Sequence, residues 1–350
     1  MLSALLVLSG VVGWRLFAPL PGDSFAELDR TDRTMLEQLA AEYAATASAP
    51  EQVWTTEWRF EEQPLALLRT GGDQSAFWDY AVLVNMSDVM DTGGLPRISV
   101  PGHPELKDVV LSKRFGVTDP MNYIPGAFNW MEVDGRSVMA LRYNDDLLRG
   151  RAASIVGGFQ EVAIHEEFHG SAQKSWTYRE GEAPYIEDYP LEDAQLDLLR
   201  QELAAFDAAD GVTDPARLRQ IGADIVSIRS ERERRWPQLK PQSSLEKMEG
   251  TATYVERAAA KLRGAAVPRV DMTDALDTLR KSGALEGLER DVFYDTGARL
   301  GMMLDWVAPN WKADITSGST TPFDVLKEAT GVRTPPTSEE LSEIAARLRD

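Results

Sequence analysis

The sequence predicts an α+β protein, with a small mixed or antiparallel sheet followed by a mostly helical part. Two observations lead to this prediction. Between residues 51 and 145, short β-rich runs are separated by Gly, Pro, Asn and Asp. Beyond Leu147, apolar residues recur at three-to-four spacing in longer segments that Pro, Gly or capping residues bound. With 350 residues, 43% of them hydrophobic, the chain can build one large domain or two ordinary ones.

Residues 1–22 are predicted to be a signal peptide or a membrane anchor. The chain is apolar from Leu2 to Trp14 and breaks at Pro19. That length suits the core of a signal peptide better than a full membrane span. We therefore expect an extracytoplasmic protein, which is secreted, periplasmic or tethered to a membrane through its N-terminus. A short buried helix is the alternative for this segment.

Residues 23–145 are predicted to form the N-terminal β-rich part. It opens with a surface helix over 24–47, where apolar residues follow a helical spacing. The sequence VDGR at 133–136 is a hairpin turn signal. The strand-like runs are QVWTTEWRF, FWDYAVLV, LPRISV, YIPGAFNWMEV and SVMALRYN.

Residues 146–333 are predicted to form the helical part. The charged run 229–242 predicts a solvated helix end followed by a turn. Residues 334–350 predict a C-terminal tail helix, because Thr337 and Glu340 have the spacing of a capping box. Helices are expected over 147–170, 191–208, 214–235, 243–263, 273–281, 284–308 and 322–330.

The composition excludes several classes of function. The formal net charge is −19, from 56 acidic and 37 basic residues, so a polyphosphate backbone is repelled and no nucleic-acid partner is expected. The chain has no cysteine, which rules out disulfides, cysteine nucleophiles and thiolate metal sites. A metal ion must therefore be bound by His, Asp, Glu, carbonyl groups or water.

The stretch VAIHEEFHGS (162–171) holds two of the three histidines of the chain. On a helix, His165 and His169 emerge from one face and can bind one ion. Glu166 is rotated by about 100° around the axis and can reach a water on that ion, which is the H-E-x-x-H pattern. Zinc lowers the pKa of such a water toward about 7, and a carboxylate can pass its proton to a leaving amine. Glu167 must point away from the metal or compete for it; a chance match on an ordinary helix is the alternative.

A catalytic zinc site needs a third protein ligand. His103 stands between Gly and Pro, so we expect it in a surface turn. The segment EGTATYVE (249–256) resembles the E-G-x-A-x-Y-x-E segment of gluzincin zinc metallopeptidases, the branch that contains aminopeptidase-type and thermolysin-like enzymes. The resemblance implies a zincin-like fold with Glu249 as third ligand. Gly250 and Ala252 would be small because the two metal-bearing helices pack closely.

A second segment, VFYDTGARLGMMLDW (292–306), resembles the Y-x-x-G-A stretch of the aminopeptidase-type enzymes. The resemblance implies that Tyr294 donates a hydrogen bond to the developing oxyanion. An ordinary core tyrosine is the alternative. Candidates for orienting the imidazoles through their second nitrogens are Asp295, Glu246 and Glu256.

The chain also departs from the pattern of those enzymes. Glu249 follows His169 by 80 positions, far more than in the aminopeptidase-type enzymes, so residues 171–245 would be a helical insertion. The sequence PGAFNW (125–130) lies where those enzymes carry a strand that captures the free amino group of the substrate. Here Asn129 stands where their amine-binding glutamate would fall, which puts exopeptidase action in doubt.

The sequence therefore predicts a zinc-dependent metallopeptidase that acts on a peptide or protein substrate. Its expected metal ligands are His165, His169 and Glu249, with Glu166 as general base and Tyr294 as the other catalytic residue. Two alternatives remain open at this point: a zinc amidase that acts on a non-protein substrate, and a catalytically silent metallopeptidase-like module that binds peptides.

Overall fold

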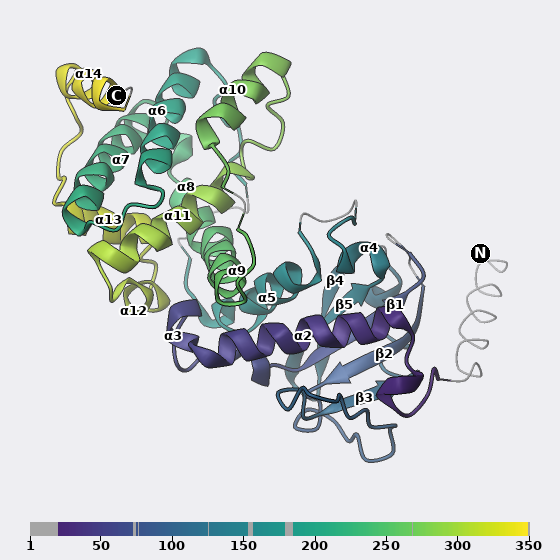
Figure 1. Cartoon of the computed structure of the whole chain (residues 1–350). Helices are drawn as coiled ribbons and strands as arrows, with labels where there is room; N and C mark the ends of the chain where they lie inside the picture. The colour runs from purple at the N-terminus through teal and green to yellow at the C-terminus, as the bar shows by residue number, and fades with distance from the viewer. Residues whose placement is uncertain are drawn as a thin grey trace. The chain divides into compact units, whose positions relative to one another are not determined.

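The computed structural model describes residues 20–72, 75, 77–124, 126–152, 157–178, 185–267 and 269–348. They form helices and a five-stranded mixed sheet (Figure 1). The predicted sheet followed by helices is confirmed at this level. Nearly all of the predicted signal peptide or anchor, 1–22, lies outside the described residues. No helix in the described ranges is long and apolar enough to cross a membrane.

The chain divides into two compact units. The first contains the residues up to Ala172 together with Ala258–Ala265. The second contains Gln173–Arg257 and the residues from Ala266 onward. The whole sheet lies in the first unit, and the second unit is helical.

The sheet has the strand order β3-β2-β1-β5-β4. Its central pair, β1 with β5, is parallel, and the other pairs are antiparallel. The turn between β4 and β5 is the one that VDGR predicts: Val133 pairs with Arg136, while Asp134 and Gly135 have φ of 47° and 78°. Two successive positive φ angles are the signature of a type I′ hairpin turn. The strands are β1 (Leu65–Thr70), β2 (Trp78–Val84), β3 (Val109–Ser112), β4 (Phe128–Val133) and β5 (Arg136–Tyr143).

The two faces of the sheet pack against different partners. Because side chains alternate along a strand, one face of β1 and β5 presents Ala66, Leu68, Val138 and Ala140, which belong to one buried cluster. The hydroxyl of Tyr143, on the other face, donates a 2.7 Å hydrogen bond to the buried Asp32 of helix α2 (Arg30–Ser48). Helix α2 therefore crosses this second face (Figure 1).

Two of the five strand predictions were wrong or incomplete, and two strands were missed. The run QVWTTEWRF forms helix α3 (Pro50–Val53) and the 3-10 turn η2 (Phe60–Glu62) instead of a strand. The run LPRISV contributes only a single bridge, from Arg97 to Val110. Strands β1 and β3 were missed, since both are short apolar runs that periodicity alone does not assign.

The helical prediction is confirmed with shifted boundaries. The expected helix 147–170 is two helices, because Gly150 and Gly157 adopt positive φ between them. The capping box of Thr337 and Glu340 begins the last helix as predicted. The helices here are α4 (Asp145–Leu148), α5 (Phe159–Gly170), α6 (Asp193–Ala209), α7 (Pro215–Arg235), α8 (Gln242–Leu245), the π-helix η6 (Glu246–Gly250), α9 (Thr251–Leu262), α10 (Met272–Ser282), α11 (Val292–Val307), α12 (Trp311–Thr316), α13 (Pro322–Thr330) and α14 (Ser338–Arg347).

The charged run 229–242 corrects another prediction. Helix α7 does end at Arg235, and the turn η5 (Pro237–Leu239) follows. The run is not a solvated helix end throughout, because Arg229 and Arg232 are fully buried. Both guanidinium groups pair with the equally buried carboxylate of Glu202. A charge that has such partners can lie in the core at a helix terminus.

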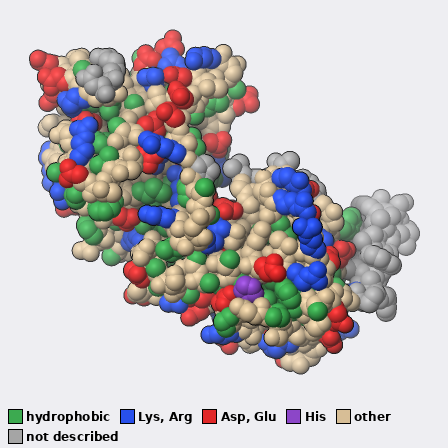
Figure 2. Space-filling model, in the orientation of Figure 1, with side chains coloured by type: hydrophobic (Ala, Val, Ile, Leu, Met, Phe, Trp, Pro, Cys, Tyr) green, Lys and Arg blue, Asp and Glu red, His purple; other side chains and the backbone are tan. Residues whose placement is uncertain are grey.

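The acidic excess of the chain does not gather in one place on the face that Figure 2 shows. There, Asp and Glu side chains are interspersed with Lys and Arg side chains. Such a mixed surface is what solubility requires, and it gives no sign of a single acidic binding face on this side.

Candidate metal centre

Helix α5 carries His165 and His169 one turn apart on the same face. Their ring centroids lie 4.8 Å apart with an angle of 74° between the ring planes. His165 is buried, and His169 is half-buried. The helical i, i+4 spacing that the sequence predicts is therefore present, and it brings the two imidazoles side by side.

Aromatic packing holds the C-terminal turn of α5 in place. Phe168 makes edge-to-face contacts with Trp54 and Trp58, at centroid distances of 4.9 and 5.2 Å. The indole nitrogen of Trp58 also donates a 2.8 Å hydrogen bond to Ser171 Oγ, just beyond the helix. These contacts explain why the run QVWTTEWRF is rich in aromatic residues without forming a strand.

Gly170, directly after His169, permits a close approach by the sheet. A Cβ atom at Gly170 would lie 1.7 Å from Cη2 of Trp130 on β4. No other residue fits beneath that indole unless the indole or the backbone shifts. Trp130 thus faces α5, whereas the neighbouring Asn129 pairs with Ala140 and shares the opposite face of the sheet. The amine-capturing position suggested for Asn129 is therefore on the face turned away from α5, although β4 is an edge strand.

The two glutamates between the histidines have different surroundings. Glu166 is half-buried, whereas Glu167 is 3% exposed. Burial raises the pKa of Glu167 well above its usual range, against the opposing effect of a hydrogen bond with Ser171. Glu167 is therefore directed into the core of the first unit, the orientation that a metal-binding role for its neighbours requires.

Glu249 lies in the π-helix η6 between α8 and α9. Its residue is 8% exposed, and its Oε1 lies 3.4 Å from Nη2 of Arg290. A π-helix disturbs the regular backbone pattern, and such bulges occur frequently at functional sites. Gln173 supports this turn, because its Nε2 donates to Met248 O at 2.7 Å and to Thr251 Oγ1 at 2.8 Å.

Gly250 is small for a reason other than the predicted one. A Cβ atom at Gly250 would lie 2.4 Å from Cα of Gly297 on α11, and one at Gly297 would lie 2.6 Å from Cα of Gly250. Two helical backbones therefore touch at these glycines. Glycine is required at position 250 because of the contact with α11. Gly250 of the E-G-x-A segment and Gly297 of the Y-x-x-G-A segment must each be glycine because they contact each other.

Among the described residues, the three side chains predicted as metal ligands belong to a group that could hold a metal ion. One ligand atom from each of His165, His169 and Glu249 lies within 4.8 Å of the other two. Tetrahedral zinc, with bonds of about 2 Å, needs ligand atoms roughly 3.3 Å apart, which lies inside the 4.8 Å limit for these atoms. Two imidazoles and one carboxylate are also a donor set that catalytic zinc uses. The residues present therefore fit a zinc ion.

The third histidine is outside this group. His103 lies beside the turn at Gly102, and its Nδ1 is 2.9 Å from Glu105 Oε1. This is the plain turn position that its Gly and Pro neighbours predict.

Tyr294 lies on the first turn of α11, next to a residue that the sequence analysis missed. Arg290 donates from Nη2 to the phenol oxygen of Tyr294, and its guanidinium carbon lies 5.4 Å from the ring centroid. A guanidinium group has only donors, so the phenol must act as acceptor toward Arg290. Its own O–H then remains to be donated to another group. The four-residue spacing from Arg290 to Tyr294 was the one feature of the sequence that could have indicated this contact.

The three acidic residues considered as partners of the imidazoles have varied surroundings. Glu246 is fully buried and accepts hydrogen bonds from Arg229, from Thr296 Oγ1 at 2.6 Å and from Gln242 Nε2 at 3.1 Å. Asp295 forms an ion pair with Arg257. Glu256 is half-buried on α9.

Comparison with protein-family models, with curated proteins and with solved structures found no match. The chemistry of the centre is therefore argued from its own residues.

Proposed function

We propose that this protein is a zinc-dependent peptidase of gluzincin type with a zincin-like catalytic domain. The observation that carries the proposal is the convergence of ligand atoms from His165, His169 and Glu249 within 4.8 Å of one another. The H-E-x-x-H spacing on α5 supports it further, because it places a half-buried carboxylate next to the first ligand.

Zinc bound by these residues would supply a Lewis acid and an acidified water at neutral pH. Glu166 is the group that accepts a proton during attack on the scissile carbonyl and returns it to the leaving amine. Glu167, buried and with a raised pKa, takes no part in this transfer. The two imidazoles must be neutral to act as ligands, and their orientation follows from the packing of α5.

Tyr294 is proposed as the donor to the oxyanion that develops on the carbonyl oxygen. Arg290 holds the phenol oxygen as an acceptor, so the phenol proton can be donated away from Arg290. A nearby cation also makes a phenol a stronger donor, because it stabilises negative charge on the phenol oxygen. The substrate class proposed with this assignment is a peptide or protein.

The test combines metal analysis with assays of two variants. Glu166→Gln should retain zinc and lose hydrolysis of casein or of a peptide library, because only the proton carrier is removed. Glu249→Ala should lose both zinc and hydrolysis, because a metal ligand is removed. Glu328→Gln, an exposed carboxylate on α13, is the matched control and should behave as the wild type.

Three outcomes would contradict the proposal. The first is a wild-type protein that purifies without zinc and binds none when it is added. The second is undiminished hydrolysis by Glu166→Gln. The third is zinc binding without cleavage of any peptide: turnover of amide substrates alone would then indicate a zinc amidase, and no turnover at all a silent peptide-binding module.

A further inference from the structure

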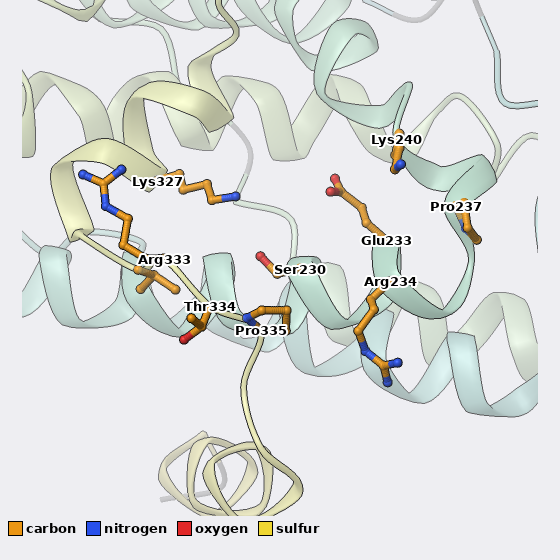
Figure 3. Close-up of a pocket in the computed structure, with 10 residues that line it drawn as sticks. Ser230, Glu233, Arg234, Pro237, Lys240, Lys327, Arg333, Thr334 and Pro335 are labelled. Carbon is orange, nitrogen blue, oxygen red and sulfur yellow. The ribbon is translucent and has the colours of Figure 1, made fainter.

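A recess in the second unit is lined by the end of α7, the η5 turn, α13 and the loop that follows α13 (Figure 3). Its volume is about 300 Å³. That volume lies at the lower end of the range for sites that bind small molecules, roughly 300–1,000 Å³. A ligand that fits it must be small.

The lining of the recess is basic, although the chain as a whole carries a net charge of −19. Arg234 is already neutralised, since it donates to Glu231 at 2.7 and 2.8 Å, and Figure 3 shows it pointing away from the other side chains. Lys240, Lys327 and Arg333 have no ion pair within the described part of the chain. Three exposed cationic groups therefore line one recess, and none of them forms an ion pair with a residue that the structure describes.

One carboxylate opposes them. Glu233 is half-buried, and Figure 3 shows its carboxylate and the ammonium group of Lys327 pointing toward the same space. Burial raises the pKa of Glu233, while the guanidinium group of Arg229 acts in the opposite direction. Three cations against one carboxylate leave a surplus of two positive charges in the recess.

Hydroxyl donors complete the lining. Ser230 is half-buried at the recess and lies between Lys327 and Glu233 in Figure 3, and Thr334 belongs to the loop that closes it. Ammonium, guanidinium and hydroxyl groups are the side-chain donors that bind phosphate and carboxylate oxygens. Pro237, Val332 and Pro335 supply the apolar part of the lining, so a ligand that carries a short apolar segment between its charged groups would also fit there.

We propose that the recess bounded by Ser230, Glu233, Lys240, Lys327 and Arg333 is a binding site for a small, doubly charged oxyanion. A phosphate monoester group and a short dicarboxylate share this chemistry. The site does not depend on the proposed peptidase activity, because none of its residues belongs to the candidate metal centre. Binding would link the end of α7 to α13 and to the loop before α14.

The test is calorimetric titration of the full chain at constant ionic strength, with inorganic phosphate and succinate as separate probes and chloride as the monovalent reference. Lys327→Gln and Lys240→Gln should each weaken binding of the preferred probe by about tenfold, which is the loss expected for one hydrogen bond to a charged group. Glu233→Gln should strengthen binding, because it removes the opposing carboxylate. Lys107→Gln, an exposed lysine of the first unit, is the matched control and should change nothing.

Weaker binding by the two lysine variants together with tighter binding by Glu233→Gln cannot result from damage to the fold, because a damaged fold does not bind the anion more tightly. Preference for phosphate would identify a phosphate monoester as the ligand class, and preference for succinate a dicarboxylate. Binding no tighter than that of chloride would overturn the proposal. Equal weakening by Lys107→Gln and Lys327→Gln would do the same, since it would show a general effect of charge.

Discussion

Arg290 is the side chain that connects two predicted parts of the candidate centre. It lies 3.4 Å from Glu249 Oε1 and donates to the phenol oxygen of Tyr294. Its role under the proposed function is to position the phenol, since Arg290 itself carries no general base or acid. The guanidinium fork is specific for this task, because a lysine offers one point charge in place of two separated donors.

Arg290→Gln should therefore lower kcat by about tenfold or more, the effect expected when a hydrogen bond to a charged group is lost. KM for the peptide should change little, and zinc content should stay at the wild-type level. Steady-state kinetics with metal analysis checks this. Arg290→Lys should recover only part of the rate. A rise in KM at unchanged kcat would instead show that Arg290 binds substrate.

Single residues also show what the sequence could and could not predict. The spacing of His165 and His169 fixed their shared helical face, because an α-helix brings i and i+4 together whatever surrounds it. Glu249 was predicted as the third ligand only through a resemblance, since nothing local links it to residues 80 positions earlier. The small residue at position 250 was attributed to packing between the two metal-bearing helices, but Gly250 contacts Gly297 on α11. A small residue indicates a close neighbour, but the sequence does not tell which neighbour it is.

Among the elements, α6, α7 and the π-helix are joined by a buried network of charges. Glu202 on α6 accepts from Arg229 and Arg232 of α7, and Arg229 also donates to Glu246 of the π-helix. Burial by itself raises the pKa of Glu202, but the two guanidinium groups outweigh it, so this pKa lies below the usual value of 4.5. The π-helix that bears Glu249 is thus attached to two long helices.

Glu202→Gln should lower the free energy of unfolding by about 3–5 kcal/mol at neutral pH, because it removes the carboxylate that pairs with Arg232 and one of the two that pair with Arg229. A carboxylate with a lowered folded-state pKa stabilises the protein above its unfolded pKa, and this contribution disappears as the pH falls through the folded pKa. The difference between variant and wild type should therefore shrink below pH 4.5. Urea unfolding at several pH values measures it, with Glu328→Gln as the control. A difference that is independent of pH would contradict the assignment.

Elements with strong local signals were predicted well. VDGR specifies a two-residue turn through Asp134 and Gly135, and Thr337 with Glu340 specifies a helix start, because in both cases neighbouring atoms decide the geometry. The run around Trp54 and Trp58 was taken for a strand, since its aromatic residues suit a sheet equally well. Its true conformation depends on Phe168, more than a hundred residues away. The buried Arg229 escaped prediction for the same reason.

For the molecule as a whole, the net charge is the basis for expecting no nucleic-acid partner. A net charge of −19 makes the average potential close to the surface negative, which repels the backbone of a nucleic acid that comes within the screening length. A small dianion in the basic recess, by contrast, interacts mainly with the few groups around it, because salt screens charges beyond about 8 Å at physiological ionic strength. The two expectations are therefore compatible.

A fluorescent DNA duplex should show no saturable rise in anisotropy with this protein at about 0.15 M salt. The same preparation should bind phosphate or succinate in the recess. Saturable duplex binding that weakens steeply as salt is added would show that basic groups gather on a surface where the overall charge conceals them.

The touching glycines at 250 and 297 have a consequence for tracing distant relatives of this chain. Because two main chains meet there without intervening side chains, a larger residue at either position would collide with the backbone opposite it. We therefore expect distant relatives to have a glycine one residue after an acidic residue and another glycine three residues after a tyrosine, even where the surrounding residues differ. Sequences that lose one glycine should show a wider separation of the two helices.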